Sequence, residues 1–248
     1  PDLAAAGQEE PSILGSLAGS ACHASIPDTL QSACLPEPSM HCCRREELEA
    51  ALSDGARGSC FQACDCPQTQ ATVRQALDVL LDQARGGALV CVGDAEAFRH
   101  VFGDGDLCPG AGPALRSSDG GYMTKRLRGV HVGDPDFAAA FAEFTAHTDS
   151  DRWPDDHRDA DARGRPKDGA ILLSKNGYVL KCAVKLLGLC PAAKWKNVGT
   201  KHEAALSCAW AVPGVLVFVR SDSGSVHVVR RQSSFLHVYE IQSTPAAQ

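Results

Sequence analysis

The spacing of apolar residues predicts both helices and strands along this chain. Apolar positions that recur every three or four residues predict helices over 44–53, 69–85, 95–102, 134–147 and 199–211. Short apolar runs between turn residues predict strands over 88–92, 169–174, 178–184, 215–219 and 225–230. Because strands and helices do not alternate regularly, we expect an α+β (mixed α/β) fold, with a central mixed sheet flanked by helices.

The same patterning divides the chain into segments. Residues 1–43 mix Ala, Ser, Pro and Cys without periodicity, which predicts poor order, and residues 1–68 form a Cys-rich, partly disordered N-terminal segment. Residues 69–243 form one domain, interrupted by a charged loop over 149–167, and residues 244–248 form a loose tail.

Seven of the twelve cysteines lie between Cys22 and Cys66. Zinc usually takes thiolates from pairs separated by two residues, whereas this stretch has an adjacent pair, Cys42-Cys43, and the pair Cys64 and Cys66 with one residue between. Zinc, disulfides and free thiols all stay open, and free thiols are the favoured interpretation. Four later cysteines lie in apolar runs and are expected to be buried: Cys91, Cys182, Cys190 and Cys208.

Composition and charge exclude several classes of function. The net charge of −6 argues against DNA binding, and the aromatic content of 6% argues against a stacking platform for single-stranded nucleic acid. No apolar run approaches the roughly 18 to 20 residues that cross a bilayer. The first residues also lack the basic-then-apolar pattern of a secretion signal. We therefore expect a soluble, cytoplasmic protein that does not contact membranes.

The basic residues are unevenly distributed. No acidic residue lies between Asp168 and Glu203, and this stretch holds six lysines: Lys175, Lys181, Lys185, Lys194, Lys196 and Lys201. One interpretation is a solvated basic face. The other is a cleft kept free of carboxylates so that a phosphorylated ligand can enter.

Asp168-Gly169-Ala170 directly precedes a predicted apolar strand. A carboxylate at the edge of a strand is exposed yet rigidly held, so Asp168 could bind a divalent metal or accept a proton from a hydroxyl. A second copy of the tripeptide, at residues 54–56, follows a predicted helix and is explained by turn chemistry.

Gly199-Thr200-Lys201-His202 opens the predicted helix over 199–211. The first turn of a helix presents unpaired N–H groups that suit a phosphate, Gly199 permits close approach, and Lys201 adds a positive charge. The alternative is an ordinary helix start, with Thr200 as the N-cap and a solvent-facing His202.

Residues 220–224, with the sequence Arg-Ser-Asp-Ser-Gly, follow a predicted strand. Asp222 could be a second metal ligand. The alternative is an ordinary hairpin turn, in which Asp, Ser and Gly are the usual residues.

The order of these motifs resembles the diadenylate cyclase (DisA N-terminal, or DAC) domain family. The resemblance covers about residues 87–229 and is closest over 168–230. It implies a DAC-like fold in which two domains meet face to face, each holding one ATP. The two ATP molecules then condense to cyclic di-AMP with the help of Mg²⁺ or Mn²⁺.

The resemblance also implies roles for individual residues. Asp168 would serve the metal and the attacking ribose hydroxyl, His202 would be a second catalytic residue, and Asp222 would be a second metal ligand. The expected nucleotide contacts come from Gly169, Ala170, Gly199, Thr200, Lys201 and Ser221.

Two departures from the family pattern bear on activity. Lys201 and Glu203 stand where the family has arginines. If Glu203 faces the triphosphate, each contact between the two negative charges at about 4 Å costs roughly 4 kcal/mol at an effective dielectric near 20. Ser221 and Asp222 occupy the family's two Glu positions, so one carboxylate is lost and the other is shortened. In these respects the chain is similar to the divergent, sensor-type members of the family.

Three hypotheses result. The favoured one is a sensor of adenine nucleotide or cyclic di-AMP that does not turn its ligand over. The alternatives are an active diadenylate cyclase, and a Cys-rich metal or interaction module on a DAC-like scaffold. Both nucleotide hypotheses require Asp168 and the turn over 199–202 to border one common hollow.

Overall fold

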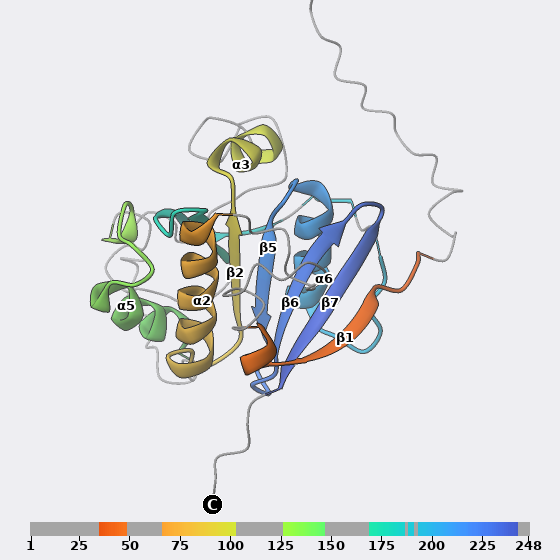
Figure 1. Cartoon of the computed structure of the whole chain (residues 1–248), viewed down its shortest axis with the longest axis horizontal. Coiled ribbons are helices and arrows are strands. Elements are labelled where there is room, and N and C mark those ends of the chain that lie inside the picture. The colour runs from red at the N-terminus through yellow and green to blue at the C-terminus, as the bar shows by residue number, and fades with distance from the viewer. Residues whose placement is uncertain are drawn as a thin grey trace, which may run out of the picture. The chain divides into compact units, whose positions relative to one another are not determined.

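A seven-stranded mixed sheet organises the fold, with the strand order β1-β7-β6-β5-β2-β3-β4 (Figure 1). The strands are β1 (Ser39–Arg44), β2 (Ala88–Gly93), β3 (Ala170–Ser174), β4 (Val179–Val184), β5 (Leu216–Arg220), β6 (Val226–Gln232) and β7 (Phe235–Gln242). β1 pairs with β7 in parallel, as does β2 with β3, and the other neighbours are antiparallel. The predicted α+β fold with a central mixed sheet is confirmed.

The computed structural model describes residues 35–48, 66–102, 126–146, 169–186, 188–190 and 193–242. All of them belong to one compact unit, Leu35–Gln248. Asp168, most of the N-terminal Cys-rich segment, the predicted loop over 149–167 and the predicted tail lie outside the described residues.

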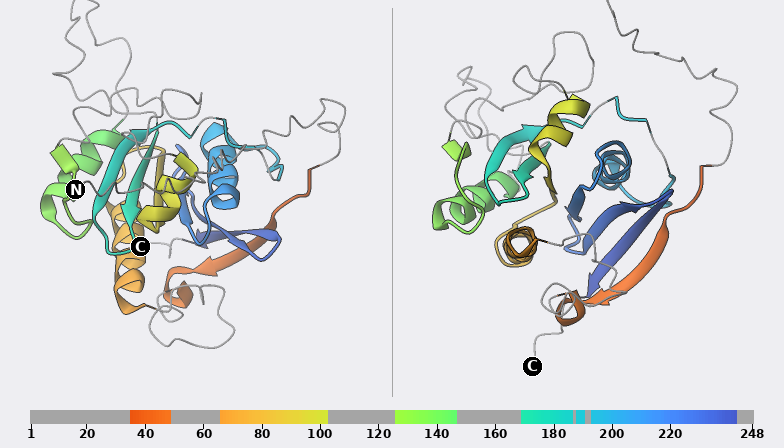
Figure 2. Two further views of the ribbon diagram at one scale, coloured as in Figure 1. Left: turned by 90° about the horizontal axis from the view of Figure 1, so that it is seen from above. Right: turned by 45° about the horizontal axis from the view of Figure 1, so that its top comes forward.

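Helices cover both faces of the sheet (Figure 2). They are α2 (Pro67–Asp82), α3 (Ala95–Phe102), α5 (Pro135–Thr145) and α6 (Thr200–Ala211), and each matches a predicted helix closely. The apolar faces of α2 and α5 pack on one side of the sheet, with Leu77 and Phe141 wholly inside that core. α3 and α6 pack on the other side, where Phe98 and Leu206 are buried.

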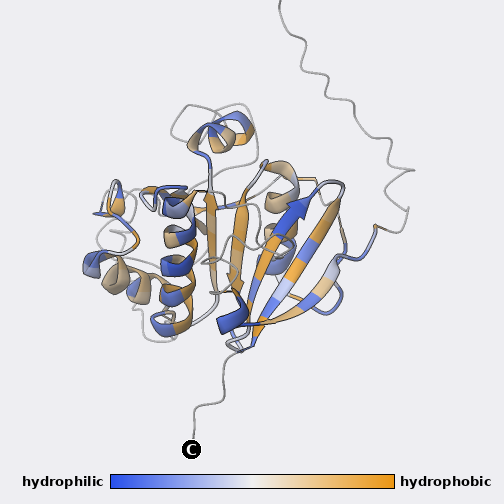
Figure 3. Ribbon diagram, viewed as in Figure 1, coloured by the Kyte–Doolittle hydropathy of each residue, from blue (hydrophilic) through white to orange (hydrophobic). Residues whose placement is uncertain are grey.

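The central strands are buried on both faces because helices cover both sides. β2 and β5 are apolar along almost their whole lengths, whereas β6 and β7 include polar positions (Figure 3). A strand covered on both faces reads as a continuous apolar run rather than an alternating one. This is why residues 88–92 and 215–219 were recognisable as strands from the sequence.

The structure extends the sheet beyond its predicted limits. Ser39–Arg44 form an edge strand, whereas the sequence predicts poor order up to residue 43 and a domain that begins at residue 69. β7 is the second strand absent from the prediction, and it buries Leu236, Val238 and Ile241 while exposing Phe235. β1 pairs with the outer edge of β7, whose backbone N–H and C=O groups would otherwise lack a partner in the sheet.

The described cysteines are free thiols. Cys91, Cys182 and Cys208 are buried as predicted, but Cys190 is exposed, so the prediction for that residue is wrong. Cys190 lies in the connection between β4 and α6, where no strand or helix draws the apolar run into the core.

Candidate functional site

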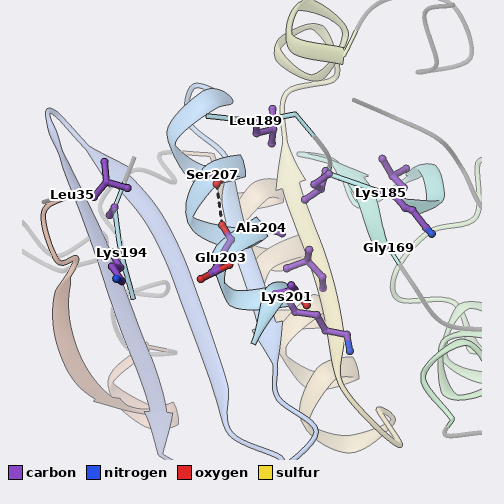
Figure 4. A pocket seen from close by; sticks show the side chains of 14 residues that line it. Leu35, Gly169, Lys185, Leu189, Lys194, Lys201, Glu203, Ala204 and Ser207 are labelled. Atoms are coloured by element: carbon purple, nitrogen blue, oxygen red, sulfur yellow. Dashed lines mark hydrogen bonds between the residues drawn. The ribbon is translucent and has the colours of Figure 1, made fainter. Parts of the chain in front are cut away.

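A pocket lies between α6 and the ends of β3 and β4, with a volume of about 700 Å³ (Figure 4). Its walls are formed by Leu35, Leu89, Gly169, Val184, Lys185, Leu186, Leu189, Ala193, Lys194, Thr200, Lys201, Glu203, Ala204 and Ser207. The lining combines an apolar part with lysines and the first turn of a helix. It therefore offers both a surface for a planar apolar group and contacts for an anion.

Sheet topology explains why distant motifs meet here. β2 and β3 are parallel neighbours, so the residues that precede them, Gly87 and Gly169, lie at the same end of the sheet. β5 runs antiparallel to β2 and places Arg220 opposite Ala88, which brings the turn after β5 to that end as well. Gly169 thereby lines the same pocket as Thr200 and Lys201.

Gly169 has a structural reason to be glycine. Its φ is +129°, and a Cβ at this position would lie 2.5 Å from the carbonyl carbon of Ala183 in β4. The pairing between β3 and β4 is irregular here, and Ala183 itself has a φ of 55°. The side chain of Ala170 is wholly buried in the core, so it offers no surface to a ligand.

The start of α6 differs from its predicted form. Gly199, not Thr200, is the N-cap, and no side chain caps the helix. Thr200 is the first helical residue and is exposed, so its hydroxyl and the unpaired N–H groups of the first turn can serve a ligand. Gly199, a predicted ligand contact, is exposed and does not line the pocket, and a Cβ built on it would meet no atom within 4 Å.

Lys201 and Asp222 form an ion pair beside the pocket. The Nζ of Lys201 lies 3.9 Å from Oδ1 of Asp222, which also accepts a 2.8 Å hydrogen bond from the backbone N–H of Gly87. Arg220 anchors the same turn by donating to the carbonyl of Gly86 at 2.8 Å. These contacts hold the turn after β5 against the loop that precedes β2.

Ser221 and Asp222 are predicted ligand contacts that do not line the pocket. The Ser221 hydroxyl lies 2.7 Å from both the Ser223 and Ser225 hydroxyls, within its own turn. Within the described ranges, no group of three or more His, Cys, Asp or Glu side chains is placed to hold a metal ion. Asp168, the other predicted metal ligand, lies outside the described residues, so the metal site that it would form with Asp222 stays a prediction.

His202 is buried, with 7% of its surface exposed, and does not line the pocket. Its ring packs edge-to-face against Trp195 and His227, at centroid distances of 4.9 and 5.3 Å. Burial, followed by the neighbouring His227 and Lys201, lowers the pKa of His202 from 6.5 to about 4, so the ring is neutral at pH 7. The solvent-facing alternative for His202 is therefore wrong.

Glu203 lines the pocket and is exposed (Figure 4). It lies one turn along α6 from Thr200, on the same side of the helix. No described residue forms an ion pair with its carboxylate. The negative charge of Glu203 therefore faces the same space as Lys185, Lys194 and Lys201.

One wall of the pocket comes from Leu35, which no local sequence pattern places in the site. Leu35 lines the pocket, and the next residue, Pro36, accepts a 3.1 Å hydrogen bond from the backbone N–H of Lys194. Glu37 forms a 2.5 Å ion pair with Lys196. These contacts join residues that are far apart in sequence, so no local sequence pattern predicts them.

Comparison of the chain with known protein families, with curated proteins and with solved structures finds no match. Among the described residues, no helix combines the length and apolar character that crossing a membrane requires.

Proposed function

We propose that this pocket binds an adenine nucleotide or cyclic di-AMP, and that the chain acts as a sensor of that ligand. The observation that carries the proposal is the shared pocket of Gly169, Thr200 and Lys201. These residues come from the two motifs on which the resemblance to diadenylate cyclase domains depends, and they are separated by a hairpin and a long connection.

The polar part of the pocket suits a phosphate. The first turn of α6 supplies unpaired N–H groups and the positive end of the helix dipole. Thr200 adds a hydroxyl donor, and Lys185 and Lys201 add positive charges.

The apolar part suits a base. Leu89, Val184, Leu186 and Leu189 line the pocket beside the polar groups. The volume of about 700 Å³ falls within the range of roughly 300–1,000 Å³ that is typical of small-molecule sites. A nucleotide, with one planar and one anionic part, matches this division.

Two observations favour a sensor over an enzyme. Glu203 brings a negative charge to a pocket in which a cyclase must stabilise a triphosphate. His202, the predicted second catalytic residue, is buried between Trp195 and His227. Ligand binding needs neither an arginine at position 203 nor an exposed imidazole.

Calorimetric titration of the full chain with AMP, ATP and cyclic di-AMP tests this proposal. We expect binding of at least one ligand, and Lys201→Ala to weaken it by about tenfold, or 1.4 kcal/mol. Lys175→Ala is the matched control, since Lys175 pairs with Asp94 at 3.7 Å and does not line the pocket. An absence of binding by all three ligands would reject the proposal.

An active diadenylate cyclase is the second candidate, and the position of Gly169 favours it. Gly169 directly follows Asp168 and lines the pocket with Thr200. Incubation with ATP and Mg²⁺ or Mn²⁺, followed by detection of cyclic di-AMP, decides between the candidates. Cyclase activity should vanish in Asp168→Asn, and activity that survives this change would reject the catalytic role of Asp168.

A further inference from the structure

Among the described residues, the charges around the pocket nearly cancel. Lys185, Lys194 and Lys201 contribute three positive charges, and Glu203 contributes one negative charge. Asp222 lies 3.9 Å from Lys201 and contributes a second negative charge. These described residues leave one positive charge uncompensated, which is far too little to balance an ATP molecule that carries about four negative charges.

The charges are also divided between two ends of the pocket. In Figure 4, Lys194 and Leu35 lie on one side of Glu203, whereas Gly169 and Lys185 lie on the other. The Lys201 side chain points away from the Glu203 carboxylate. The uncompensated positive charge of the described residues therefore lies at the Gly169 end, while Lys194 and Glu203 carry opposite charges at the Leu35 end.

We infer that the pocket selects a ligand with one or two negative charges, a nucleoside monophosphate or a cyclic dinucleotide, and that Glu203 discriminates against a triphosphate. This inference rests on the proposed function and goes beyond it by naming the charge class of the ligand and the residue that determines it.

The geometry of α6 gives Glu203 this role. Residues three apart on a helix have Cβ atoms about 5–6 Å from each other, so a phosphate at Thr200 lies close to the Glu203 side chain. A single phosphate can lie on the Lys201 side of Thr200, which is the side away from the Glu203 carboxylate. Two further phosphates need more space along the same helix face, where they approach the Glu203 charge.

Glu203 also has a favourable role toward a less charged ligand. Its carboxylate is an acceptor without a described partner, and the ribose hydroxyls and the base amino group of a nucleotide are donors. A carboxylate that accepts from a ribose hydroxyl is a common feature of nucleotide sites. Glu203 can therefore bind the sugar or base of the ligand that it selects by charge.

Calorimetry with EDTA present and at constant ionic strength tests this inference, because without metal the ligands differ mainly in charge. The probes are AMP, cyclic di-AMP, ATP, inorganic phosphate and tripolyphosphate. We expect wild type to bind AMP or cyclic di-AMP more tightly than ATP. Glu203→Gln should strengthen ATP binding by about tenfold, the size of one water-screened charge contact, and leave AMP binding within about threefold.

Glu96→Gln is the matched control, since it removes the same charge from an exposed position on α3, outside the pocket. Tighter binding of ATP than of AMP and cyclic di-AMP by wild type would overturn the inference, as would an unchanged ATP-to-AMP ratio in Glu203→Gln.

The two inorganic anions separate this inference from the proposed function. If no nucleotide binds, the proposed function is rejected. The discrimination by Glu203 against highly charged anions is then tested by the affinities for phosphate and tripolyphosphate. Relative to wild type, Glu203→Gln should raise the affinity for tripolyphosphate more than the affinity for phosphate. An equal effect on both anions, or no binding of either, would overturn the role of Glu203 as well.

Discussion

The carboxylate of Asp222 accepts a 2.8 Å hydrogen bond from the backbone N–H of Gly87, joining the turn after β5 to the residue that precedes β2. The same oxygen lies 3.9 Å from Nζ of Lys201 at the start of α6. Asp222 therefore connects three segments at the end of the sheet where the pocket lies, although it does not line that pocket itself.

Replacement of Gly87 by alanine should disrupt this junction. A Cβ on Gly87 would collide with Oδ1 of Asp222 and lie 3.0 Å from Nζ of Lys201. We expect Gly87→Ala to lower the free energy of unfolding by about 1–2 kcal/mol, the typical cost of a lost hydrogen bond, in urea denaturation. In an Asp222→Ala background the same change should cost less than half as much, and an equal cost would contradict this explanation.

Asp222→Asn should strengthen anion binding. Asparagine keeps an oxygen that can accept from Gly87 but removes the charge beside Lys201. We expect phosphate or nucleotide affinity to rise by roughly threefold at low ionic strength, because contacts between exposed charges are weak. The gain should disappear in about 1 M salt, where the Debye length is near 3 Å. Weaker binding in the variant would argue that Asp222 contacts the ligand directly.

Gly169→Ala should destabilise the protein strongly. Its φ of +129° is unfavourable for alanine, and the new Cβ would lie 2.5 Å from the backbone of Ala183, which cannot rotate away. We expect a loss of about 2–4 kcal/mol in unfolding experiments. Gly214→Ala is the control, since Gly214 also has a positive φ of 69° but no atom within 4 Å, and it should cost only about 1–2 kcal/mol.

Stability should fall in mild acid because His202 is buried as a neutral ring. Its pKa is 6.5 ordinarily and about 4 in the folded protein, so the unfolded chain binds the proton more tightly. The contribution of neutral His202 to the free energy of unfolding is therefore complete above pH 6.5. It is lost as the pH falls toward 4, by an amount on the order of 2 kcal/mol. Urea unfolding at pH 7 and pH 4.5 measures this loss.

His202→Phe should reduce the difference in stability between these two pH values, since phenylalanine has no proton to bind. His100→Gln, at an exposed position of α3, should leave the difference unchanged. The explanation fails if both variants keep the wild-type difference. His227 has a lowered pKa as well, through burial, so some pH dependence should remain in His202→Phe.

Thiol labelling of the native protein should follow burial. Cys91, Cys182 and Cys208 should be protected, and the exposed residues Cys66 and Cys190 should react with iodoacetamide. The backbone N–H groups of Thr69 and Gln68 lower the pKa of Cys66, which raises its thiolate fraction at pH 7 and so its rate. Peptide mass spectrometry after short exposure checks this order, and labelling of Cys208 before Cys66 would contradict it.

Local patterns made most of the fold predictable. The helices and the central strands were found because their apolar residues keep a constant spacing or form unbroken runs, as in Ala95–Phe102 and Ala88–Gly93. β1 was not found, because five of its six residues are outside the core and its existence depends on pairing with β7. β7 could have been found from the alternation of Leu236, Val238 and the polar residues between them.

The candidate site was predictable in part for similar reasons. Thr200 and Lys201 were identified from a helix start, and Gly169 from its place before a strand, because each motif is local. The burial of His202 was not predictable, since it depends on Trp195 and His227 from other parts of the chain. The wall formed by Leu35 was missed because its contacts cross most of the sequence.

The parallel pairing of β1 with β7 has a consequence for how the molecule is made. β1 is the first described strand to leave the ribosome, and its partner is the last. β1 therefore remains unpaired until β7 has been synthesised. The segment that carries Leu35 stays undocked for as long, so the pocket acquires this wall only after β7 has been synthesised.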